Sequence, residues 1–479
     1  MNLRQKVISG LRWSAGLRFA GQFVTWIITI TVMRLLSPQD YGLMGMAGIF
    51  ITFLTMVNEL GLGVALIQKK DLNEEMMRQV FGLLIIINLG LFLLCLAAAP
   101  FAAFFFEEQR LVPLIRLISI QFIIASFVII PQSAIDREML FREKSIVELI
   151  SAIAGSLTTL SLALHNWGVW SLVWGTLTLN LCRAVGINTI HPFLKLPSFS
   201  IKGIKGVISF GGYVTITRML WTLYIRADII IIGKLLGKQF LGFYSVALNL
   251  ASLPMEKVSG IIHQVAFPAF ASVQTDVDQV GSHFLKAVRI MSFVAFPVLW
   301  GISSIAPDLV SIALGEKWSL ATVPLQILSL VIPFRMISNL ISPALLGLGQ
   351  PVINLYNVIT ASLILPFVQL IACIWGGIIG VSIAWSTIFP IIFLINLSRM
   401  LKMLKQGFRE VFVAISKPIS SAVVMYISVV VIKSIMSGSN PILRLSLSIF
   451  TGAVVYACMI LIVNREGYHE VLDLIRIRQ

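Results

Sequence analysis

The stretch FGGYVTITRMLWTLYIRADIIIIGKLLGKQFLGFYSVALNLASLPMEKVSGIIH, Phe210–His263, decides the fold, because two apolar segments are joined here by a short Gly-containing turn. Polar residues recur in both segments every three or four positions, which places them on one face of a helix. An arginine at the centre of a bilayer costs about 2.5–3.5 kcal/mol, so we expect these faces to line a protein interior or a wet cavity. The polar residues are Thr215, Arg218, Thr222 and Arg226, then Ser245, Asn249, Ser252, Glu256, Ser259 and His263.

A second stretch, about 200 residues earlier, has the same layout. The segment Arg34–Ala47 aligns with Lys234–Ala247 without a gap, and the two share a Leu-Leu pair, a glutamine, a glycine and the final alanine. Arg18 precedes the earlier segment at the offset at which Arg218 precedes the later one. We interpret this as an internal repeat. The alternative is chance similarity between apolar helices.

Composition excludes an ordinary soluble protein. The chain has 479 residues, a mean hydropathy of +0.94, 58% hydrophobic residues and 12% charged residues. Apolar runs of about 18 residues or more recur along the chain, as in transmembrane helices. The net charge of +15 lies mostly in short loops between these runs, so membrane topology explains it and no nucleic-acid partner is expected.

Cysteine usage and the N-terminal segment add two negative expectations. The cysteines at 95, 182, 373 and 458 lie inside apolar runs without paired spacing, so neither a metal site nor a disulfide framework is predicted. The segment MNLRQKVISGLRW resembles an amphipathic basic lead-in to the first span more than a cleavable signal peptide.

Hydropathy predicts about fourteen membrane spans. Clusters of Lys and Arg at 69–78, 137–144 and 399–409 place these loops, and both termini, in the cytoplasm. The spans are expected at roughly residues 10–33, 42–66, 79–106, 112–132, 145–164, 168–190, 208–232, 241–265, 286–307, 321–346, 352–373, 377–398, 414–435 and 442–463.

Six spans separate the two repeat starts, so both copies begin on the same side of the membrane and are parallel. We therefore predict an all-α integral membrane protein with a six-helix lobe at 1–200, a second at 201–405, and two further helices with a cytoplasmic tail at 406–479. Transporters with parallel repeats bind substrate near the midplane between two bundles. The predicted external loops are too short for a membrane glycosyltransferase or polysaccharide polymerase.

No pattern of catalytic chemistry is found. The sequence lacks a nucleotide-binding P-loop, an HExxH motif and zinc-type Cys/His spacing, and no Ser-His-Asp set can be argued. We expect no catalytic residue, no metal and no enzymatic activity.

Charged residues inside the predicted spans are the most informative candidates. The cations are Arg18, Arg218, Arg226, Lys257 and Arg335, and the acids are Glu59, Asp228 and Glu256. One interpretation is structural, with each charge paired to a neighbour, as Arg226 would be to Asp228. The other is that a net cationic interior holds phosphate, because a guanidinium presents a permanently charged fork of donors. Arg335 stands beside Pro333 and Asn339, which predicts a broken helix facing a cavity.

Eight segments carry a family resemblance: RLLSPQDYGLMGMAGIF (34–50), ELGLGVALIQKKDL (59–72), APFAAFFFEEQ (99–109), IIPQSAIDREMLFREKS (129–145), NWGVWSLVWG (166–175), ADIIIIGKLLGKQFLGFYSVA (227–247), FPAFASVQTD (267–276) and GEKWSLATVPLQIL (315–328). They resemble the polysaccharide-transport branch of the multidrug/oligosaccharidyl-lipid/polysaccharide exporter superfamily, which includes the lipopolysaccharide, colanic acid and teichuronic acid repeat-unit flippases. The resemblance is strong over residues 1–400 and weak over the last two spans.

This resemblance implies a V-shaped, two-lobe flippase in the bacterial inner membrane. Its substrate would be an undecaprenyl-diphosphate-linked oligosaccharide, and its further partners membrane lipids and polysaccharide polymerase or export machinery. The diphosphate must cross about 30 Å of hydrocarbon, and a cationic cavity lowers that barrier. The side chains of Gln22, Trp26, Trp221 and Asn249 would hydrogen-bond sugar hydroxyls.

Without a nucleotide-binding motif, no cofactor is expected, and an ion gradient or downhill substrate flux would drive alternating access. Because proton or sodium coupling is common in the superfamily, Glu59, Asp228 and Glu256 are the candidate coupling carboxylates. Two alternatives stay open. A multidrug exporter would be expected to line its cavity with carboxylates, whereas this interior is net cationic. A non-transporting scaffold of a polysaccharide-assembly complex would have no use for charges inside its spans.

Overall fold

The computed structural model describes residues 21, 24–58, 74–138, 140–193, 195–199, 221–222, 224–254, 277–404 and 406–463. Most of these residues lie in helices, and none of them lies in a β-strand. Eight of the described helices are long and apolar enough to cross a membrane, or nine if the bent pair Leu111–Ser126 and Ile129–Arg137 is one span. The chain is therefore a multi-pass, all-α membrane protein, as the sequence predicts.

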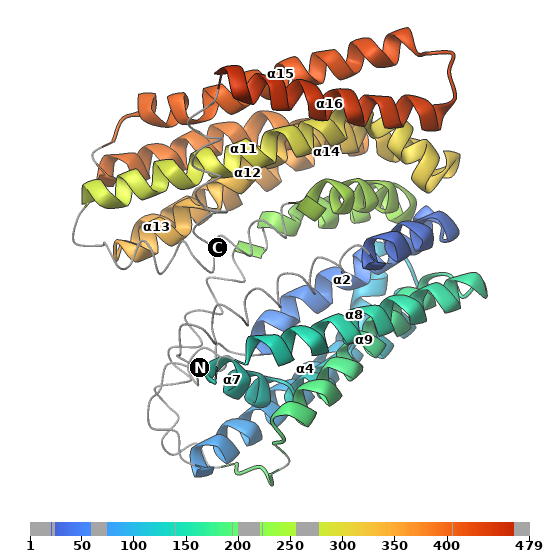
Figure 1. Ribbon diagram of the computed structural model, residues 1–479. Coiled ribbons are helices and arrows are strands. Elements are labelled where there is room, and N and C mark those ends of the chain that lie inside the picture. The colour runs from blue at the N-terminus through green and yellow to red at the C-terminus, as the bar shows by residue number, and fades with distance from the viewer. Residues whose placement is uncertain are drawn as a thin grey trace. The chain divides into compact units, whose positions relative to one another are not determined.

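The chain divides into two compact units, Met1–Gly242 and Phe243–Gln479 (Figure 1). A helix at Tyr224–Pro254 runs across the division. The first unit contains a short helix at Val24–Leu35, then α2 (Pro38–Asn58), α4 (Glu74–Phe106), α5 (Leu111–Ile118), α6 (Ile120–Ser126), α7 (Ile129–Arg137), α8 (Phe141–Leu164) and α9 (Val169–Ile190). The second contains α11 (Val277–Leu309), the π-helix η1 (Val310–Leu314), the 3-10 helix η2 (Glu316–Ala321), α12 (Thr322–Ser338), α13 (Ile341–Gly347), α14 (Pro351–Leu404), α15 (Phe408–Ile435) and α16 (Pro441–Val463).

Some polar residues inside these apolar helices donate hydrogen bonds to their own helix. Buried Asn88 donates to the carbonyl oxygen of Leu84 at 2.9 Å. Buried Ser133 donates to the carbonyl oxygen of Ile129 at 2.8 Å. Such back-bonding satisfies a polar side chain where no water is at hand, which keeps the helix compatible with a hydrocarbon environment.

Aromatic side chains build the interior of each unit. In the first unit the ring of Phe81 on α4 meets that of Phe193, after α9, edge to face at 5.6 Å between centroids. In the second, the ring of Phe296 on α11 meets that of Phe334 on α12 at 5.3 Å. Rings in this geometry contribute about 0.5–1.5 kcal/mol beyond the area they bury.

Loops assigned to one side of the membrane contact one another. On the side predicted to be cytoplasmic, Lys195 pairs with Glu74 at 2.8 Å, and the Arg78 Nε donates to the carbonyl oxygen of Leu196 at 2.9 Å. On the opposite side, the backbone N–H of Val169 donates to Asp40 at 3.0 Å. These contacts agree with the predicted alternation of spans.

The predicted repeat recurs in local geometry. Gly168 has φ 55° and ψ −134°, and Gly377, within α14, has φ 56° and ψ −141°. A side chain is strained at such a positive φ, so both turns call for glycine. A Val-Pro-Leu sequence opens α5 at 112–114 and α12 at 323–325. The span containing α6 and α7 is bent by 46° at its break, and α12 and α13 are separated by a break of their own. The elements of the two copies therefore follow in the same order.

Every predicted span overlaps a described helix, but the count of fourteen stays a prediction because several spans extend beyond the described residues. Two predicted turns are marked by glycines with positive φ, Gly237 (77°) within Tyr224–Pro254 and Gly377 within α14. The predicted boundary between residues 200 and 201 lies outside the described residues, so the lobes 1–200, 201–405 and 406–479 also remain a prediction.

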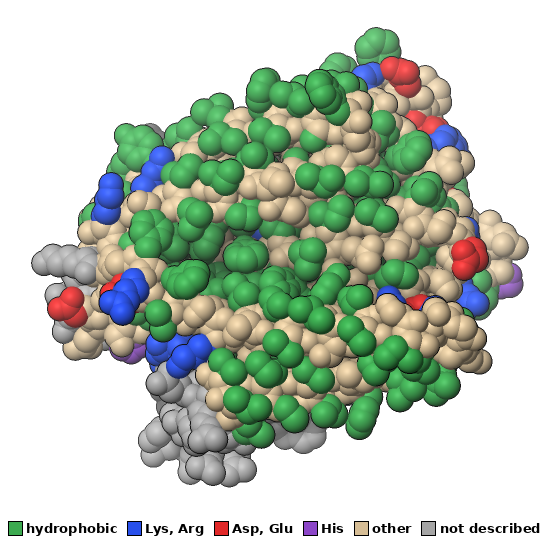
Figure 2. Space-filling view, turned by 90° about the horizontal axis from the view of Figure 1, so that it is seen from above, with side chains coloured by type: hydrophobic (Ala, Val, Ile, Leu, Met, Phe, Trp, Pro, Cys, Tyr) green, Lys and Arg blue, Asp and Glu red, His purple; other side chains and the backbone are tan. Residues whose placement is uncertain are grey.

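The side-chain distribution on the surface suits a bilayer. On the face drawn in Figure 2, hydrophobic side chains cover the middle, whereas charged side chains gather mainly toward the left and right edges. Apolar residues such as Phe104 and Phe412 are largely exposed. In a membrane protein these side chains contact lipid, so their exposure is expected.

Candidate functional site

The helix Tyr224–Pro254 carries two of the predicted site residues of the first unit. Asp228 is fully buried, and its Oδ1 accepts a hydrogen bond of 2.8 Å from the backbone N–H of Ile229. Arg226 is half-buried two residues earlier. Buried Thr222, just before this helix, donates to the sulfur of Met56 on α2 at 3.0 Å. This part of the predicted polar face is therefore directed into the first unit.

The same helix continues into the second unit, where Asn249 lies exposed on the predicted polar face. An exposed amide in an otherwise apolar helix suits a wet surface, because lipid would leave its hydrogen bonds unmade. The structure shows Asn249 exposed, and its predicted role in binding sugar stays a prediction. Asp228, in contrast, is buried.

Arg335 lies near the break between α12 and α13 that its neighbours predict. Its side chain is 7% exposed, and the guanidinium carbon lies 4.1 Å from the ring centroid of Trp385 on α14. Stacking on an indole stabilises a cation, and more so where water is excluded. In this conformation Arg335 is packed against Trp385 inside the second unit, and its predicted role in binding phosphate is a prediction still.

Six predicted site residues lie outside the described residues, so their geometry stays open. They are the cations Arg18, Arg218 and Lys257, the amide Gln22, and the carboxylates Glu59 and Glu256.

Two turns of the first unit meet backbone to backbone, and sequence reasoning did not foresee this contact. A Cβ atom added at Gly42 would lie 1.7 Å from the carbonyl oxygen of Lys238. A Cβ atom added at Gly242 would lie 1.7 Å from the carbonyl oxygen of Pro38. Each glycine, and each carbonyl, occupies the equivalent position of the other in the predicted repeat. We call this reciprocal packing of residues 37–42 against 237–242 the turn contact.

Ion pairs surround the turn contact. Lys234 donates to Glu107 at 2.7 Å, Lys238 donates to Glu108, and Arg110 pairs with Glu108 at 3.0 Å. The hydrogen bond and the charge of Lys234 hold the pKa of Glu107 below its usual value. Burial alone would raise the pKa of Glu108, but hydrogen bonds from Arg110 and Lys238 outweigh it and the pKa is lowered. Both carboxylates are therefore ionised at neutral pH.

A capping arrangement fixes the first of the two turns. The Ser37 hydroxyl and backbone N–H donate to the Oδ2 of Asp40, at 2.6 and 2.9 Å. The Oδ1 of Asp40 accepts the backbone N–H of Val169 at 3.0 Å, which ties the start of α2 to the start of α9. Asp40 thus satisfies backbone donors at two helix starts, where the macrodipole also favours a negative charge.

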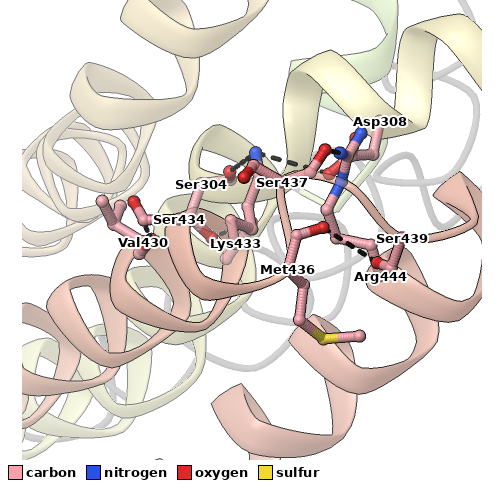
Figure 3. Close-up of polar contacts among 10 residues, drawn as sticks. Ser304, Asp308, Val430, Lys433, Ser434, Met436, Ser437, Ser439 and Arg444 are labelled. Atoms are coloured by element: carbon pink, nitrogen blue, oxygen red, sulfur yellow. Dashed lines mark hydrogen bonds and ion pairs between the residues drawn. The ribbon is translucent and has the colours of Figure 1, made fainter.

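A second charged cluster lies in the second unit (Figure 3). Asp308, near the end of α11, is 3% exposed and accepts the Nε of Arg444 on α16 at 3.1 Å. The Nζ of Lys433 on α15 lies 3.5 Å from Asp308 Oδ2 and donates to the carbonyl oxygen of Ser304 at 2.8 Å. We call these four residues the Asp308 cluster. It joins the two last helices to α11.

Sequence reasoning missed the Asp308 cluster because its partners are far apart along the chain. A signal was available: the predicted topology puts the end of the ninth span and the loop between spans thirteen and fourteen on one side of the membrane. An acid beside one span end and cations at the other two are then candidates for pairing.

Both the sequence and the fold are similar to those of known proteins. The family model described as "Polysaccharide biosynthesis protein" matches residues 31–323. The chain belongs to this family. One relative aligns with nearly the whole chain. It is the teichuronic acid biosynthesis protein TuaB of Bacillus subtilis (strain 168), which is 25% identical over 461 residues, covering 95% of each chain.

This polysaccharide biosynthesis protein is also similar to two proteins that are named as flippases. It is 22% identical over 326 residues to the probable low-salt glycan biosynthesis flippase Agl15 of Haloferax volcanii, covering 67% of this chain and 66% of the relative. The solved structure of the lipid II flippase MurJ in an inward closed conformation has a TM-score of 0.75 at 17% identity, covering 94% of this chain and 99% of MurJ. At this identity the second likeness shows the fold alone, which is that of a membrane transporter.

Proposed function

We propose that this protein is a flippase for a lipid-linked oligosaccharide, with an undecaprenyl-diphosphate carrier, in the bacterial inner membrane. The observation that carries the proposal is membership of a polysaccharide biosynthesis family, with a relative named as a probable glycan biosynthesis flippase, on a fold shared with a lipid flippase. The surface polysaccharide built from this unit would be assembled on the far side by partner polymerase or export proteins. No chemical step on the glycan is required of this chain, so we propose a transporter and not an enzyme.

The turn contact supports an alternating-access mechanism. It joins repeat-equivalent glycines near the starts of two spans, at the ends that the predicted topology places on the external side. A contact of this kind can close one side of a transporter while the other side is open. The proposed cycle breaks it to release the oligosaccharide outward and remakes it for the next substrate.

Charge in the interior supports a phosphate-bearing substrate. Arg18, Arg218, Arg226, Lys257 and Arg335 would neutralise the diphosphate, and Gln22 and Asn249 would bind the sugar. Coupling to protons or sodium would run through Glu59, Asp228 or Glu256, and no cofactor would take part. Of the three acids, buried Asp228 is the one the structure describes.

Lipid analysis of a strain lacking the gene tests the proposal. We expect undecaprenyl-diphosphate oligosaccharide to accumulate, and its mass identifies the glycan. Complementation with the wild-type chain should clear the intermediate. At equal protein abundance, the Arg18→Ala and Arg218→Ala variants should clear it about ten- to a hundredfold less efficiently than the wild type does.

Two results would contradict this function. Export of organic cations without any accumulated intermediate would favour a multidrug exporter. A normal lipid profile together with loss of polymerase from the membrane would favour a scaffold.

A further inference from the structure

A shallow, mostly apolar groove on the first unit is lined by one charged side chain, that of Arg116, which the proposed function does not explain. The groove has a volume of about 460 Å³ and lies between α4 and the α5–α6 segment. Of the residues that line it, Arg116 is the one that carries a charge. The lining residues are Phe92, Val112, Pro113, Arg116, Leu117 and Ile120.

The exposed guanidinium of Arg116 has no ion-pair or hydrogen-bond partner among the described residues. The nearby acids are engaged elsewhere, because Glu108 pairs with Arg110 and Lys238, and Glu107 pairs with Lys234. The positive charge of Arg116 is therefore not balanced by an acidic side chain among the described residues.

The depth of Arg116 in the bilayer indicates which lipid groups surround its side chain. It stands five residues into α5, which is about 7.5 Å along the helix from Leu111. Because α5 follows the short loop after α4, this depth is close to the edge of the hydrocarbon. An arginine that faces lipid there extends toward the interface, where the phosphate groups of the lipids lie.

The fold itself does not require an arginine at this position. When the Val-Pro-Leu sequences at 112–114 and 323–325 are aligned, Ile327 occupies the place of Arg116 in the second copy. An apolar residue thus serves the same helix start elsewhere in this chain. The charge has to be explained by something outside the helix.

We propose that Arg116 and this groove form a binding site for one bilayer phospholipid. The guanidinium would hold the phosphodiester, and an acyl chain would lie along Phe92, Leu117 and Ile120. The charge of the headgroup favours a phospholipid over a polyprenyl diphosphate as the ligand. A phosphodiester carries a single negative charge, which one guanidinium balances. A diphosphate calls for further cations, and the groove lining contains none.

Native mass spectrometry of the purified full-length protein, titrated with phosphatidylglycerol in mild detergent, tests the site. We expect the wild type to retain one lipid, and Arg116→Gln to bind it about ten- to a hundredfold more weakly. Leu117→Trp, which fills the groove and leaves the charge intact, should weaken binding as well. Arg110→Gln is the matched control, since it removes a cation six residues away and outside the groove, and should bind like the wild type.

Three results would overturn the proposal. Unchanged binding by Arg116→Gln would remove the arginine from the site. Equal losses in Arg116→Gln and Arg110→Gln would show attraction to charge in general. Displacement of phosphatidylglycerol by an equal concentration of undecaprenyl phosphate would assign the groove to the carrier lipid. None of these results depends on export, so the site and the flippase proposal can fail separately.

Discussion

The turn contact and the Asp308 cluster both join helices that are far apart in sequence, but they are built differently. In the turn contact, two glycines rest on the backbone of the opposite turn, and the ion pairs around it include a largely exposed carboxylate, Glu107. In the Asp308 cluster, a nearly fully buried carboxylate is shared by Lys433 and Arg444.

This difference bears on how readily each contact can separate. Backbone surfaces and the exposed ion pair of Glu107 with Lys234 can part at small cost, because water replaces the lost interactions. Separating a buried carboxylate from its cations leaves charge without compensation and costs about 3–5 kcal/mol. We infer that the turn contact suits opening and closing, whereas the Asp308 cluster holds α15 and α16 on α11 throughout.

The largest expected effect on export follows from placing a side chain in the turn contact. Gly42→Ala puts a Cβ atom 1.7 Å from the Lys238 carbonyl oxygen, so the two turns cannot pack as they do. We expect export, measured as clearance of the lipid-linked intermediate, to fall more than about tenfold, the equivalent of roughly 1.4 kcal/mol or more. Protein abundance should stay close to wild type.

Gly48 offers the matched control on the same helix. A Cβ atom there meets nothing within 4 Å, so Gly48→Ala should export normally. Normal export by Gly42→Ala would show that this contact need not form during transport, and the contrast between the two regions would lose its functional meaning.

We expect the protein to lose stability when the Asp308 cluster is disrupted. Asp308→Leu leaves Lys433 and Arg444 without their carboxylate, and the free energy of unfolding should drop by about 3–5 kcal/mol. The measurement is the thermal transition of the purified protein in detergent. Export per folded molecule should change far less than abundance does.

Replacing the whole cluster distinguishes lost pairing from lost packing. In the triple variant with Asp308→Leu, Lys433→Leu and Arg444→Leu, no uncompensated charge remains, so much of the stability should return. A triple variant as unstable as Asp308→Leu alone would mean that packing at this point, and not charge, holds the last two helices.

Much of the fold is predictable here because the repeat leaves local marks in the sequence. The alignment of Arg34–Ala47 with Lys234–Ala247 already contains Gly42 and Gly242, and the structure shows these two in equivalent contacts. What the alignment cannot reveal is that each glycine packs on the other copy. Contact between turns about 200 residues apart depends on tertiary packing, which no local pattern encodes.

The candidate site is less predictable for a related reason. The charge of Asp228 inside an apolar span marks it as a candidate, and the structure buries it, but no sequence pattern shows that Arg335 stacks on Trp385, since these two residues lie on different helices. Asp308 was overlooked because its partners lie far from it along the chain. Only the positions of Lys433 and Arg444 show that it is buried and paired.

A smaller effect is expected when the turn contact is weakened through its partly buried acid. The lowered pKa of Glu108 means that its contribution is present above the ordinary value of 4.5 and is lost as pH falls through the lowered pKa. Glu108→Gln should therefore mimic acidic conditions at neutral pH. Its two charge-assisted bonds contribute about 1–2 kcal/mol together once partial exposure is allowed for.

Distances between spin labels at the exposed residues Gln39 and Gln239 measure this change, in a chain without its native cysteines. Glu108→Gln at pH 7 should increase the separated population. Once the pH has fallen below the lowered pKa of Glu108, the wild type should match the variant. A pH-independent distance in the wild type would exclude Glu108 from control of the contact.

The smallest effect is expected at Glu107, which is 81% exposed in its pair with Lys234. Glu107 has φ 56°, a conformation that favours glycine, and in the second copy Gly315, with φ 93°, follows the corresponding helix. Glu107→Gly would relieve this backbone strain but lose the ion pair, whereas Glu107→Gln would lose the ion pair alone. We expect the Gly variant to match the wild type in label distances and the Gln variant to separate slightly more.

Raising the salt concentration from about 0.05 to 0.5 M should bring the wild type to the level of the Gln variant, because exposed pairs are screened. A large, salt-independent loss of the turn contact in Glu107→Gln would show that this exposed pair carries the contact, and the backbone packing at Gly42 and Gly242 would then be secondary.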